Sequence, residues 1–354
     1  MPKATDQVSE AIVYLNGRMT PASQAHLAIF DAGVVLGATV TEMTRTFRQV
    51  PFRLDDHLDR LFRSLRYVRF AIEQTREELA TITSELVTHN ARLLPPGGEL
   101  GIVHFVTAGE IEAYAGFERQ LERGAVGGLE RPHPGPLPEG EGTQSYAGLP
   151  LERKGTFPGS NPPAMGTPTV CIHTFPLDWR RWERAIREGM HLVIPSVRQP
   201  PPQCVDPKIK CRSRMHYYLA DQEARLVDPY ASALLLDLDG NLTETNSANF
   251  LIVDGGTLFS PTTRNTLPGI SRATVMELAA QLGIAFVERD LQPYHAINAD
   301  EAFLTSTPYC IMPVTKINGL AIGSGKPGPV YRRMLEAFSR LVGLDVEQQI
   351  VGGA

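Results

Sequence analysis

The sequence of 354 residues lacks the features that mark membrane proteins, disulfide-stabilised secreted proteins and nucleic-acid-binding proteins. No apolar run reaches the roughly 18 residues of a membrane span, and the N-terminus shows no apolar stretch of signal-peptide length. Only four cysteines occur, none in C-x-x-C spacing, which predicts reduced thiols in a cytoplasmic protein and no metal site. The formal net charge of -5 argues against nucleic-acid binding through bulk electrostatics. We therefore expect a cytoplasmic protein without membrane or nucleic-acid partners.

Several common catalytic motifs are also missing. The sequence has no G-x-S-x-G nucleophile elbow, no H-E-x-x-H zinc motif and no P-loop. The segment 323–328 matches G-x-G-x-x-G, but Pro327 interrupts the helix that a dinucleotide site needs, so we interpret it as a loop. His57 lies in the segment DDHLDRL, which predicts a solvated histidine on a helix.

One internal segment differs from the rest in composition. Residues 124–163 contain nine glycines and eight prolines among 40 residues, with few large apolar side chains. Such a segment favours a surface insertion or linker, and an active-site lid or a proline-rich peptide ligand is the alternative. We therefore expect an N-terminal α/β domain over 1–122, an insertion and linker over 123–168, and a C-terminal domain over 169–354.

Both flanking regions have the patterns of a two-domain protein of α/β and α+β class. Apolar residues recur at helical spacing over 55–70, where Asp55 is a candidate N-cap. The same reasoning predicts further helices over 77–94, 271–282 and 329–342, and strands over 11–15, 100–107, 169–175, 233–237, 249–253, 257–260 and 301–305.

Three polar segments in the C-terminal region are candidates for chemistry. Residues 206–218 place lysines and arginines beside apolar and aromatic residues, and a desolvated lysine among cations has a lowered pKa that suits imine chemistry. Glu244 lies among small polar residues next to a strand. Residues 266–272 form a turn that enters a helix, and the N–H groups of such a turn bind phosphate. A solvated basic patch, a polar turn and an ordinary helix cap remain the alternatives.

Together these segments resemble the class IV, or fold type IV, pyridoxal-phosphate enzymes. This family includes branched-chain and D-amino acid aminotransferases, (R)-selective amine transaminases and aminodeoxychorismate lyase. The resemblance runs from about residue 14 to 341 and rests on the segments IFDAGVVLGATVTEMTR, FRLDDHLDRL, KIKCRSRMHYYLADQEA, LTETNSANFLIVDGGTLFSP, LPGISR and DEAFLTSTPYCIMPV. It implies a smaller N-terminal α/β domain, a larger C-terminal pseudo-barrel domain, pyridoxal 5'-phosphate between them, and a homodimer.

The resemblance also implies roles for individual residues. Lys210 lies thirteen residues before Glu223 of the Q-E-A segment, so it is preferred to Lys208 as the lysine that forms a Schiff base with the cofactor and moves the proton from the substrate's Cα. Glu244 corresponds to the carboxylate that pairs with the pyridine nitrogen, and Tyr218 to a residue that flanks the cofactor. The remaining cofactor contacts implied are Arg60, Leu267, Gly269, Ile270, Ser271, Ser306 and Thr307.

Four positions bear on the substrate. Ala108 stands where D-amino acid aminotransferases carry an arginine, and Arg45 matches an arginine of bacterial branched-chain enzymes. Thr41 replaces a common aromatic residue, which predicts a more polar or wider side-chain pocket. Pro308 has no N–H for a substrate carboxylate. These positions favour a transaminase that uses L-amino acids of branched-chain type and 2-oxo acids. A D-amino acid or (R)-amine transaminase, a pyridoxal-phosphate lyase, and a binding protein without turnover are the alternatives.

Overall fold

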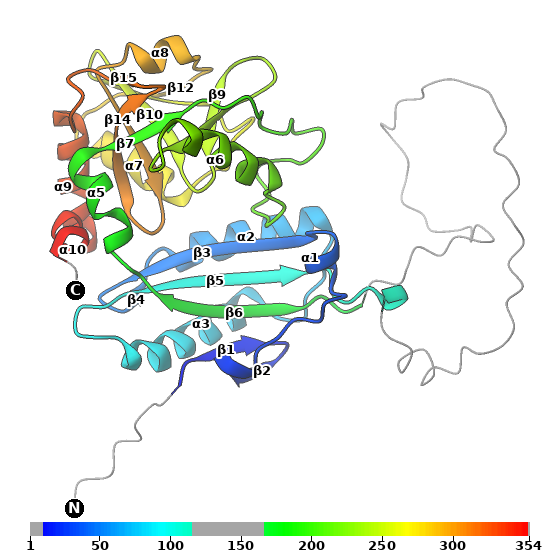
Figure 1. Ribbon diagram of the computed structural model, residues 1–354. Coiled ribbons are helices and arrows are strands. Elements are labelled where there is room, and N and C mark those ends of the chain that lie inside the picture. The colour runs from blue at the N-terminus through cyan, green and yellow to red at the C-terminus, as the bar shows by residue number, and fades with distance from the viewer. Residues whose placement is uncertain (1–9, 115–165, 353–354) are drawn as a thin grey trace, which may run out of the picture.

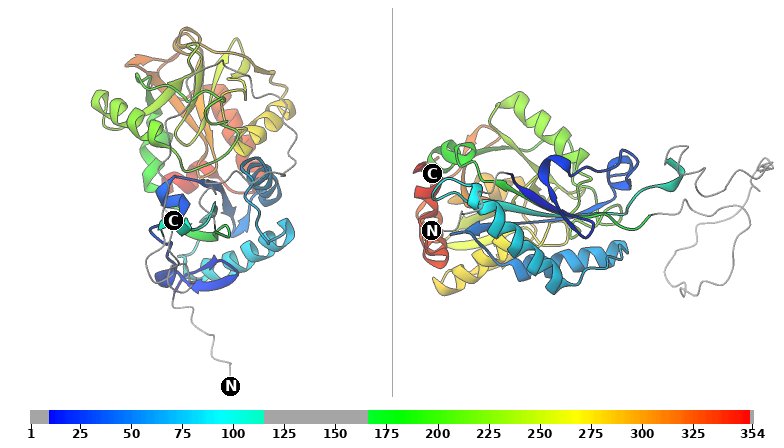
Figure 2. Two further views of the ribbon diagram at one scale, coloured as in Figure 1. Left: turned by 90° about the vertical axis from the view of Figure 1, so that its right-hand side faces the viewer. Right: turned by 90° about the horizontal axis from the view of Figure 1, so that it is seen from below.

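The computed structural model describes residues 10–114 and 166–352. The segment 124–163, with its predicted insertion, lies outside the described residues. The described residues form two domains stacked against each other, with the N-terminal sheet below the C-terminal one in Figure 1 and in the left view of Figure 2. No helix within the described ranges is long and apolar enough to cross a membrane.

The N-terminal domain is an antiparallel sheet covered by two helices. Its strand order is β2-β1-β6-β5-β3-β4. The strands are β1 (Ile12–Leu15), β2 (Arg18–Pro21), β3 (Thr39–Phe47), β4 (Val50–Pro51), β5 (Leu100–Thr107) and β6 (Val170–Pro176). The helical elements are η1 (Ala22–Gln24), α1 (Ala32–Val35), α2 (Leu54–Val68), α3 (Arg76–Asn90), η2 (Ala91–Leu93) and η3 (Glu112–Tyr114). Leucines of α2 and α3 pack on the apolar face of β3 and β5, because both helices repeat leucine at helical spacing.

The strand β6 changes the domain assignment. We expected this segment in the C-terminal domain, but β6 pairs with β1 and with β5, where Val103 faces His173. An expectation based on chain order could not foresee this, because the glycine- and proline-rich segment separates β5 from β6 in the sequence. We propose that the domain boundary lies after Pro176 and not after residue 168.

The C-terminal domain contains a sheet that closes on itself. The strand order is β12-β11-β10-β13-β14-β7-β8-β9, and an additional pairing of β9 with β10 joins Glu244 to Asn249. Six strands therefore form a closed ring, β10-β13-β14-β7-β8-β9, while β11, β12 and β15 extend it. The bounds are β7 (Met190–Val193), β8 (Ser232–Leu236), β9 (Leu242–Thr245), β10 (Asn249–Asp254), β11 (Thr257–Ser260), β12 (Phe286–Glu288), β13 (Glu301–Ser306), β14 (Cys310–Ile317) and β15 (Leu320–Ala321). The expected pseudo-barrel is present.

Helices surround this ring and complete its core. They are α5 (Arg180–Glu188), α6 (Met215–Val227), α7 (Ile270–Gln281), α8 (Pro293–Ile297), α9 (Pro329–Val342) and α10 (Val346–Gly352). Phe250, Phe303 and Phe338 are fully buried between strands and helices. The helix predicted over 329–342 is confirmed at both ends. The N-cap prediction for Asp55 is wrong, because Arg53 occupies the cap with a φ of 52° and Asp55 lies in the first turn.

Candidate active site

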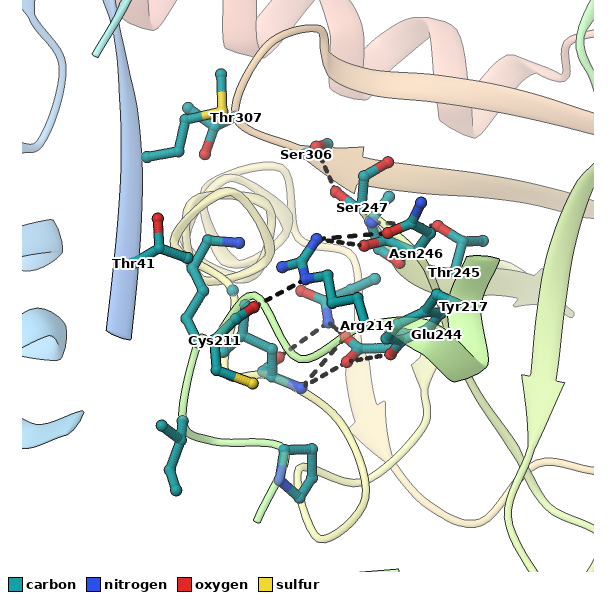
Figure 3. A pocket seen from close by; sticks show the side chains of 18 of the residues that line it. Thr41, Cys211, Arg214, Tyr217, Glu244, Thr245, Asn246, Ser247, Ser306 and Thr307 are labelled. Atoms are coloured by element: carbon teal, nitrogen blue, oxygen red, sulfur yellow. Dashed lines mark hydrogen bonds between the residues drawn. The ribbon is translucent and has the colours of Figure 1, made fainter. Parts of the chain in front are cut away.

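A cavity of about 230 Å³ lies where the two domains meet. Thr41 and Met43 of β3 and Arg60 of α2 line it from the N-terminal domain, and the rest of its wall comes from the C-terminal domain. Of the expected site residues, all except Arg45 and Tyr218 line this one cavity: Thr41, Arg60, Lys210, Glu244, Leu267, Gly269, Ile270, Ser271, Ser306, Thr307 and Pro308. Residues from six separate segments thus converge, and Figure 3 shows part of this arrangement.

Lys210 lies in the segment that precedes α6. Its carbonyl accepts a hydrogen bond of 2.7 Å from the N–H of Thr41, which fixes the lysine backbone to β3. Its amine has no hydrogen-bond or ion-pair partner among the described residues. Desolvation first, and then the charge of Arg214, lower the pKa of Lys210 to about 7. Lys210 therefore presents a partly neutral amine to the cavity at neutral pH.

Lys208 has a different environment, although it is only two residues away. It is exposed, it does not line the cavity, and its Nζ lies 3.1 Å from an Asp206 carboxylate oxygen. The structure therefore supports the choice of Lys210 over Lys208.

Glu244 lies on β9 at the point where the ring of strands closes. Its carboxylate accepts hydrogen bonds from the side-chain amide of Asn249 at 2.8 Å, from the N–H of Leu267 at 3.2 Å and from the hydroxyl of Tyr217 at 3.2 Å. All three donors are neutral. Burial raises the pKa of Glu244 to about 7, against the opposing effect of these hydrogen bonds. A cationic group in the cavity would favour its ionised form.

A turn at the N-terminus of α7 provides hydrogen-bond donors for an anion. Gly269 is the N-cap, and no side chain caps the helix there, so the first N–H groups of α7 lack intrahelical partners. The guanidinium of Arg60 donates from Nη1 to the carbonyl of Pro268 at 2.7 Å, which holds α2 against this turn. A Cβ at position 269 would overlap Oδ1 of Asn249, so the close approach of the turn requires glycine.

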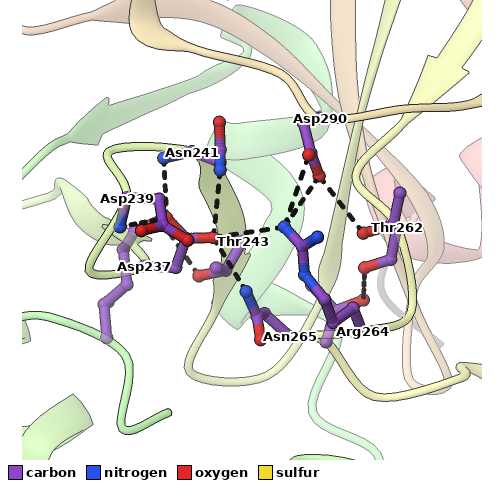
Figure 4. Close-up of polar contacts among 10 residues, drawn as sticks. Asp237, Asp239, Asn241, Thr243, Thr262, Arg264, Asn265 and Asp290 are labelled. Atoms are coloured by element: carbon purple, nitrogen blue, oxygen red, sulfur yellow. Dashed lines mark hydrogen bonds and ion pairs between the residues drawn. The ribbon is translucent and has the colours of Figure 1, made fainter. Parts of the chain in front are cut away.

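A polar network on the outer side supports the same turn (Figure 4). One carboxylate oxygen of Asp237 accepts from the N–H groups of Asp239 and Asn241, at 3.0 and 2.8 Å. The other oxygen accepts from the side-chain amide of Asn265 at 2.8 Å, two residues before Leu267. Asp237 therefore links the β8–β9 turn to the segment that leads into α7.

Arg45 does not reach the cavity, which corrects the expectation of a substrate contact. Its guanidinium is fully buried, 3.9 Å from the ring centre of Phe47 and 4.7 Å from that of Trp179. Alternation along β3 puts it on the same face as Thr41 and Met43, but farther along the strand, where α10 covers it through Gln349.

Several residues in and behind the cavity wall were missed by sequence reasoning. Tyr217 lines the cavity, whereas Tyr218 is 60% exposed and does not. The expectation of a solvated His57 is wrong: the side chain is buried, and its Nδ1 lies 3.0 Å from the carboxylate of Glu42. That carboxylate also accepts two hydrogen bonds from Arg60, at 2.7 and 2.6 Å, so Glu42 orients Arg60. The signal that could have identified Glu42 was an acidic residue in the centre of TVTEMTRTF, where β-branched residues predominate.

The cavity also contains polar atoms without partners. Oε1 of Gln199, Nε2 of His216 and Oγ1 of Thr305 are buried and make no hydrogen bond among the described residues. Buried polar groups rarely remain unpaired in a native protein. Together with the unpaired amine of Lys210, these atoms indicate that the site is suited to a polar ligand.

Comparison with known proteins agrees with this geometry. The family model "Amino-transferase class IV" matches residues 150–317. The chain is 27% identical over 334 residues to branched-chain-amino-acid aminotransferase-like protein 1 of Arabidopsis thaliana, covering 94% of this chain but only 51% of that protein. It is 26% identical to D-alanine aminotransferase of Bacillus licheniformis, covering 93% of this chain and 96% of the relative. It is also 26% identical to branched-chain-amino-acid aminotransferase of Escherichia coli, covering 92% and 91%.

Solved structures share the fold. The branched-chain amino acid aminotransferase of Escherichia coli superposes with a TM-score of 0.75 at 24% identity, covering 94% of this chain and 95% of that one. Another branched-chain amino acid aminotransferase, solved with pyridoxamine 5'-phosphate, gives a TM-score of 0.73 at 22% identity, covering 95% and 96%. The fold is therefore that of the fold type IV enzymes, as expected.

Pyridoxal 5'-phosphate has three groups that match side chains and N–H groups of the cavity. Its phosphate suits Arg60 and the start of α7, its ring nitrogen suits Glu244, and its aldehyde suits the amine of Lys210. The fold, the cavity chemistry and the family match together make the chain similar to the class IV aminotransferases, a family of pyridoxal-phosphate-dependent enzymes.

Proposed function

We propose that the protein transfers an amino group between an amino acid, of L configuration and branched-chain type, and a 2-oxo acid. The observation that carries the proposal is the unpaired amine of Lys210 in one cavity with Glu244 and Arg60. A lysine with a pKa of about 7 is a nucleophile at neutral pH, as attachment of an aldehyde cofactor requires.

Each cofactor contact follows from a group already positioned by the fold. The guanidinium of Arg60 and the N–H groups of Ile270 and Ser271 would hold the phosphate. The carboxylate of Glu244 would hold the ring nitrogen in its protonated form. When bound, pyridoxal 5'-phosphate supplies an electron sink for the carbanion formed at the substrate's Cα.

Proton transfer falls to Lys210. Its Nζ takes a proton from the substrate's Cα and returns one later in the reaction, which requires an amine whose pKa lies near the working pH. The hydrogen bond from Thr41 to the Lys210 carbonyl limits movement of the backbone while the side chain moves.

The side-chain pocket favours an aliphatic substrate. Met43, Val205 and Ile209 line the cavity together with Thr41. The hydroxyl of Thr41 donates to the carbonyl of His104 at 3.0 Å, so it is already engaged within the sheet and adds little polarity to the pocket. Ala108 is buried and packs in the small cluster around Ala32, outside the cavity.

A second candidate is a D-amino acid or (R)-amine transaminase. It is favoured by the identity to D-alanine aminotransferase, which is as high as that to the Escherichia coli branched-chain enzyme. A pyridoxal-phosphate lyase and a binding protein without turnover are further alternatives. The test is a panel that pairs L- and D-amino acids and (R)-amines with 2-oxoglutarate and pyruvate. Leucine or valine as the best donor supports the proposal, and D-alanine or an (R)-amine as the best donor overturns the choice of substrate.

We also propose a homodimer. Large apolar side chains are exposed on two surfaces: Ile29 and Leu36 on the N-terminal domain, at 85% and 63%, and Leu226 at the end of α6, at 88%. Large apolar side chains exposed in a single chain are often buried when copies of the chain associate. Light scattering of the purified protein decides between monomer and dimer. A cytoplasmic location is likewise proposed, on the free state of Cys171, Cys204, Cys211 and Cys310.

A further inference from the structure

The charges that line the cavity do not balance. Four cationic side chains line it, those of Arg60, Lys210, Arg212 and Arg214, while Glu244 is the one carboxylate among its described lining residues. Glu42 lies behind Arg60 and accepts two hydrogen bonds from it, so the charge of Arg60 is matched. Lys210 and Glu244 have opposite charges and mutually stabilising effects. Within the described part of the chain, the two remaining arginines have no counter-charge in contact.

Arg214 is held in place by neutral groups alone. Its Nε donates to the carbonyl of Cys211 at 3.0 Å and its Nη1 to the carbonyl of Asn246 at 3.0 Å. The side-chain amide of Asn246 donates a further hydrogen bond of 3.2 Å to Asp221, so among the described residues no carboxylate contacts the guanidinium itself. Figure 3 shows this guanidinium between Cys211 and Asn246. Nη2 makes no hydrogen bond in the described part of the chain.

Arg212 stands beside it at the junction of the domains. Its backbone N–H donates to Oγ1 of Thr39 at 2.8 Å, and the next residue, Ser213, donates from its hydroxyl to the carbonyl of Gly37 at 2.7 Å. The backbone is thus fixed, while the guanidinium has no partner within the described ranges. Desolvation, and then the charge of Arg214, lower the pKa of Arg212, and a bound anion would oppose the effect of that charge.

We propose that Arg212 and Arg214 form the subsite for the carboxylate of the substrate. The inference rests on the proposed function, since that carboxylate belongs to its amino acid or 2-oxo acid. A guanidinium matches a carboxylate through parallel N–H donors. Carbonyl groups orient Arg214 before the ligand arrives, so binding costs little side-chain entropy. The cavity wall also includes Pro308, which has no N–H to donate, so the arginines are the better donors for a carboxylate.

The pair would also make the enzyme select against amines that lack a carboxylate. A substrate without a carboxylate leaves two adjacent cations uncompensated, whereas a carboxylate neutralises them. The two arginines should therefore control the ratio of the affinity for an acid to the affinity for its uncharged analogue.

The test measures binding to the cofactor-loaded enzyme without turnover. The probes are 4-methylvalerate, which has a carboxylate but no amine, and its uncharged amide of the same shape. Calorimetry gives both affinities for the wild type, Arg212→Gln, Arg214→Gln, Arg214→Lys and the double Gln variant. The control is Lys208→Gln, which removes the same charge from the same segment but lies outside the cavity. Affinity of each variant for pyridoxal 5'-phosphate is measured in parallel.

We expect the double variant to bind the carboxylate about 10- to 100-fold more weakly and the amide unchanged, while Lys208→Gln matches the wild type. Arg214→Lys keeps the positive charge and should preserve part of the affinity for the carboxylate. Partial rescue by lysine would show that the loss in Arg214→Gln comes from the missing charge and not from misfolding. Unchanged carboxylate affinity in the double variant overturns the proposal. An equal loss of affinity for the acid and for its amide overturns it too. A loss of affinity for pyridoxal 5'-phosphate alone also overturns it, because it would assign Arg214 to the cofactor. If binding of 4-methylvalerate depends on the arginines but no donor of the panel transfers its amino group, the proposed function is rejected and the carboxylate subsite is retained.

Discussion

The Nη1 atom of Arg45 donates a hydrogen bond of 2.7 Å to the carbonyl oxygen of Pro308. Pro308 lines the cavity and Arg45 does not, so the arginine acts on the cavity wall from behind. Through Nη2 the same guanidinium donates to Oε1 of Gln349 on α10 at 2.8 Å. One buried side chain of the N-terminal domain therefore joins the cavity wall to the C-terminal helix.

Replacement of Arg45 by methionine should reduce the stability of the fold without a specific loss of carboxylate recognition. The variant loses the hydrogen bonds that the charged guanidinium donates to Pro308 and Gln349. It also loses the cation–π contacts of the guanidinium with the rings of Phe47 and Trp179. We expect the free energy of unfolding to fall by about 2–4 kcal/mol, measured by denaturant titration. KM should change alike for amino acids and for carboxylate-free amines. A variant of unchanged stability with a raised KM for amino acids only would contradict this prediction. It would support the earlier expectation that Arg45 contacts the substrate carboxylate directly.

Replacement of Lys210 by alanine should abolish covalent attachment of the cofactor. The reason is that Lys210 alone of the two neighbouring lysines has its amine in the cavity. Borohydride reduction followed by peptide mapping should label Lys210 in the wild type and in Lys208→Ala, and nothing in Lys210→Ala. A label on Lys208 in the wild-type protein would disprove the assignment.

Replacement of Glu244 by glutamine should lower turnover much more than cofactor affinity. The uncharged amide no longer favours a protonated ring nitrogen, and the carbanion loses part of its stabilisation. A loss of kcat of about 10²-fold is expected from the removal of one preorganised electrostatic contact. Stopped-flow kinetics with the best donor of the panel gives this value, and an unchanged kcat would mean that Glu244 does not act on the ring.

The same variant should be more stable than the wild type when no cofactor is bound. The folded pKa of Glu244 is about 7 against 4.5 for the free residue, so the folded protein binds more protons between these values and its stability falls as pH rises through that window. Glutamine has no such penalty. We expect a gain of about 1–3 kcal/mol above pH 7 that disappears toward pH 4.5. Denaturant titrations at several pH values measure it, and a gain that is largest at low pH would contradict the assignment.

Replacement of Gly269 by alanine should weaken cofactor binding. The new Cβ collides with Asn249 Oδ1, so either the turn or the Asn249–Glu244 hydrogen bond must shift. We expect a dissociation constant for pyridoxal 5'-phosphate about tenfold higher, measured by fluorescence quenching, with Ser271→Ala as a milder change in the same turn. Wild-type affinity in Gly269→Ala would show that this turn does not contact the phosphate.

Local patterns in the sequence determined much of this protein. Apolar spacing located α2 and α9, and the segments around Lys210, Glu244 and 267–271 indicated the resemblance to the class IV aminotransferases that the family model also finds. Short-range rules suffice there, because helix periodicity and turn chemistry depend on neighbouring residues.

The tertiary structure decided what depends on distant partners. Pairing between segments far apart in the chain placed β6 in the N-terminal sheet, and burial by α10 and Trp179 removed Arg45 from the cavity. Whether a charged side chain faces solvent, another residue or a ligand is determined by segments far away in the chain. His57 and Arg214 show this: their residue types are plain in the sequence, but only the fold places one against Glu42 and leaves the other lining the cavity without a counter-ion among the described residues.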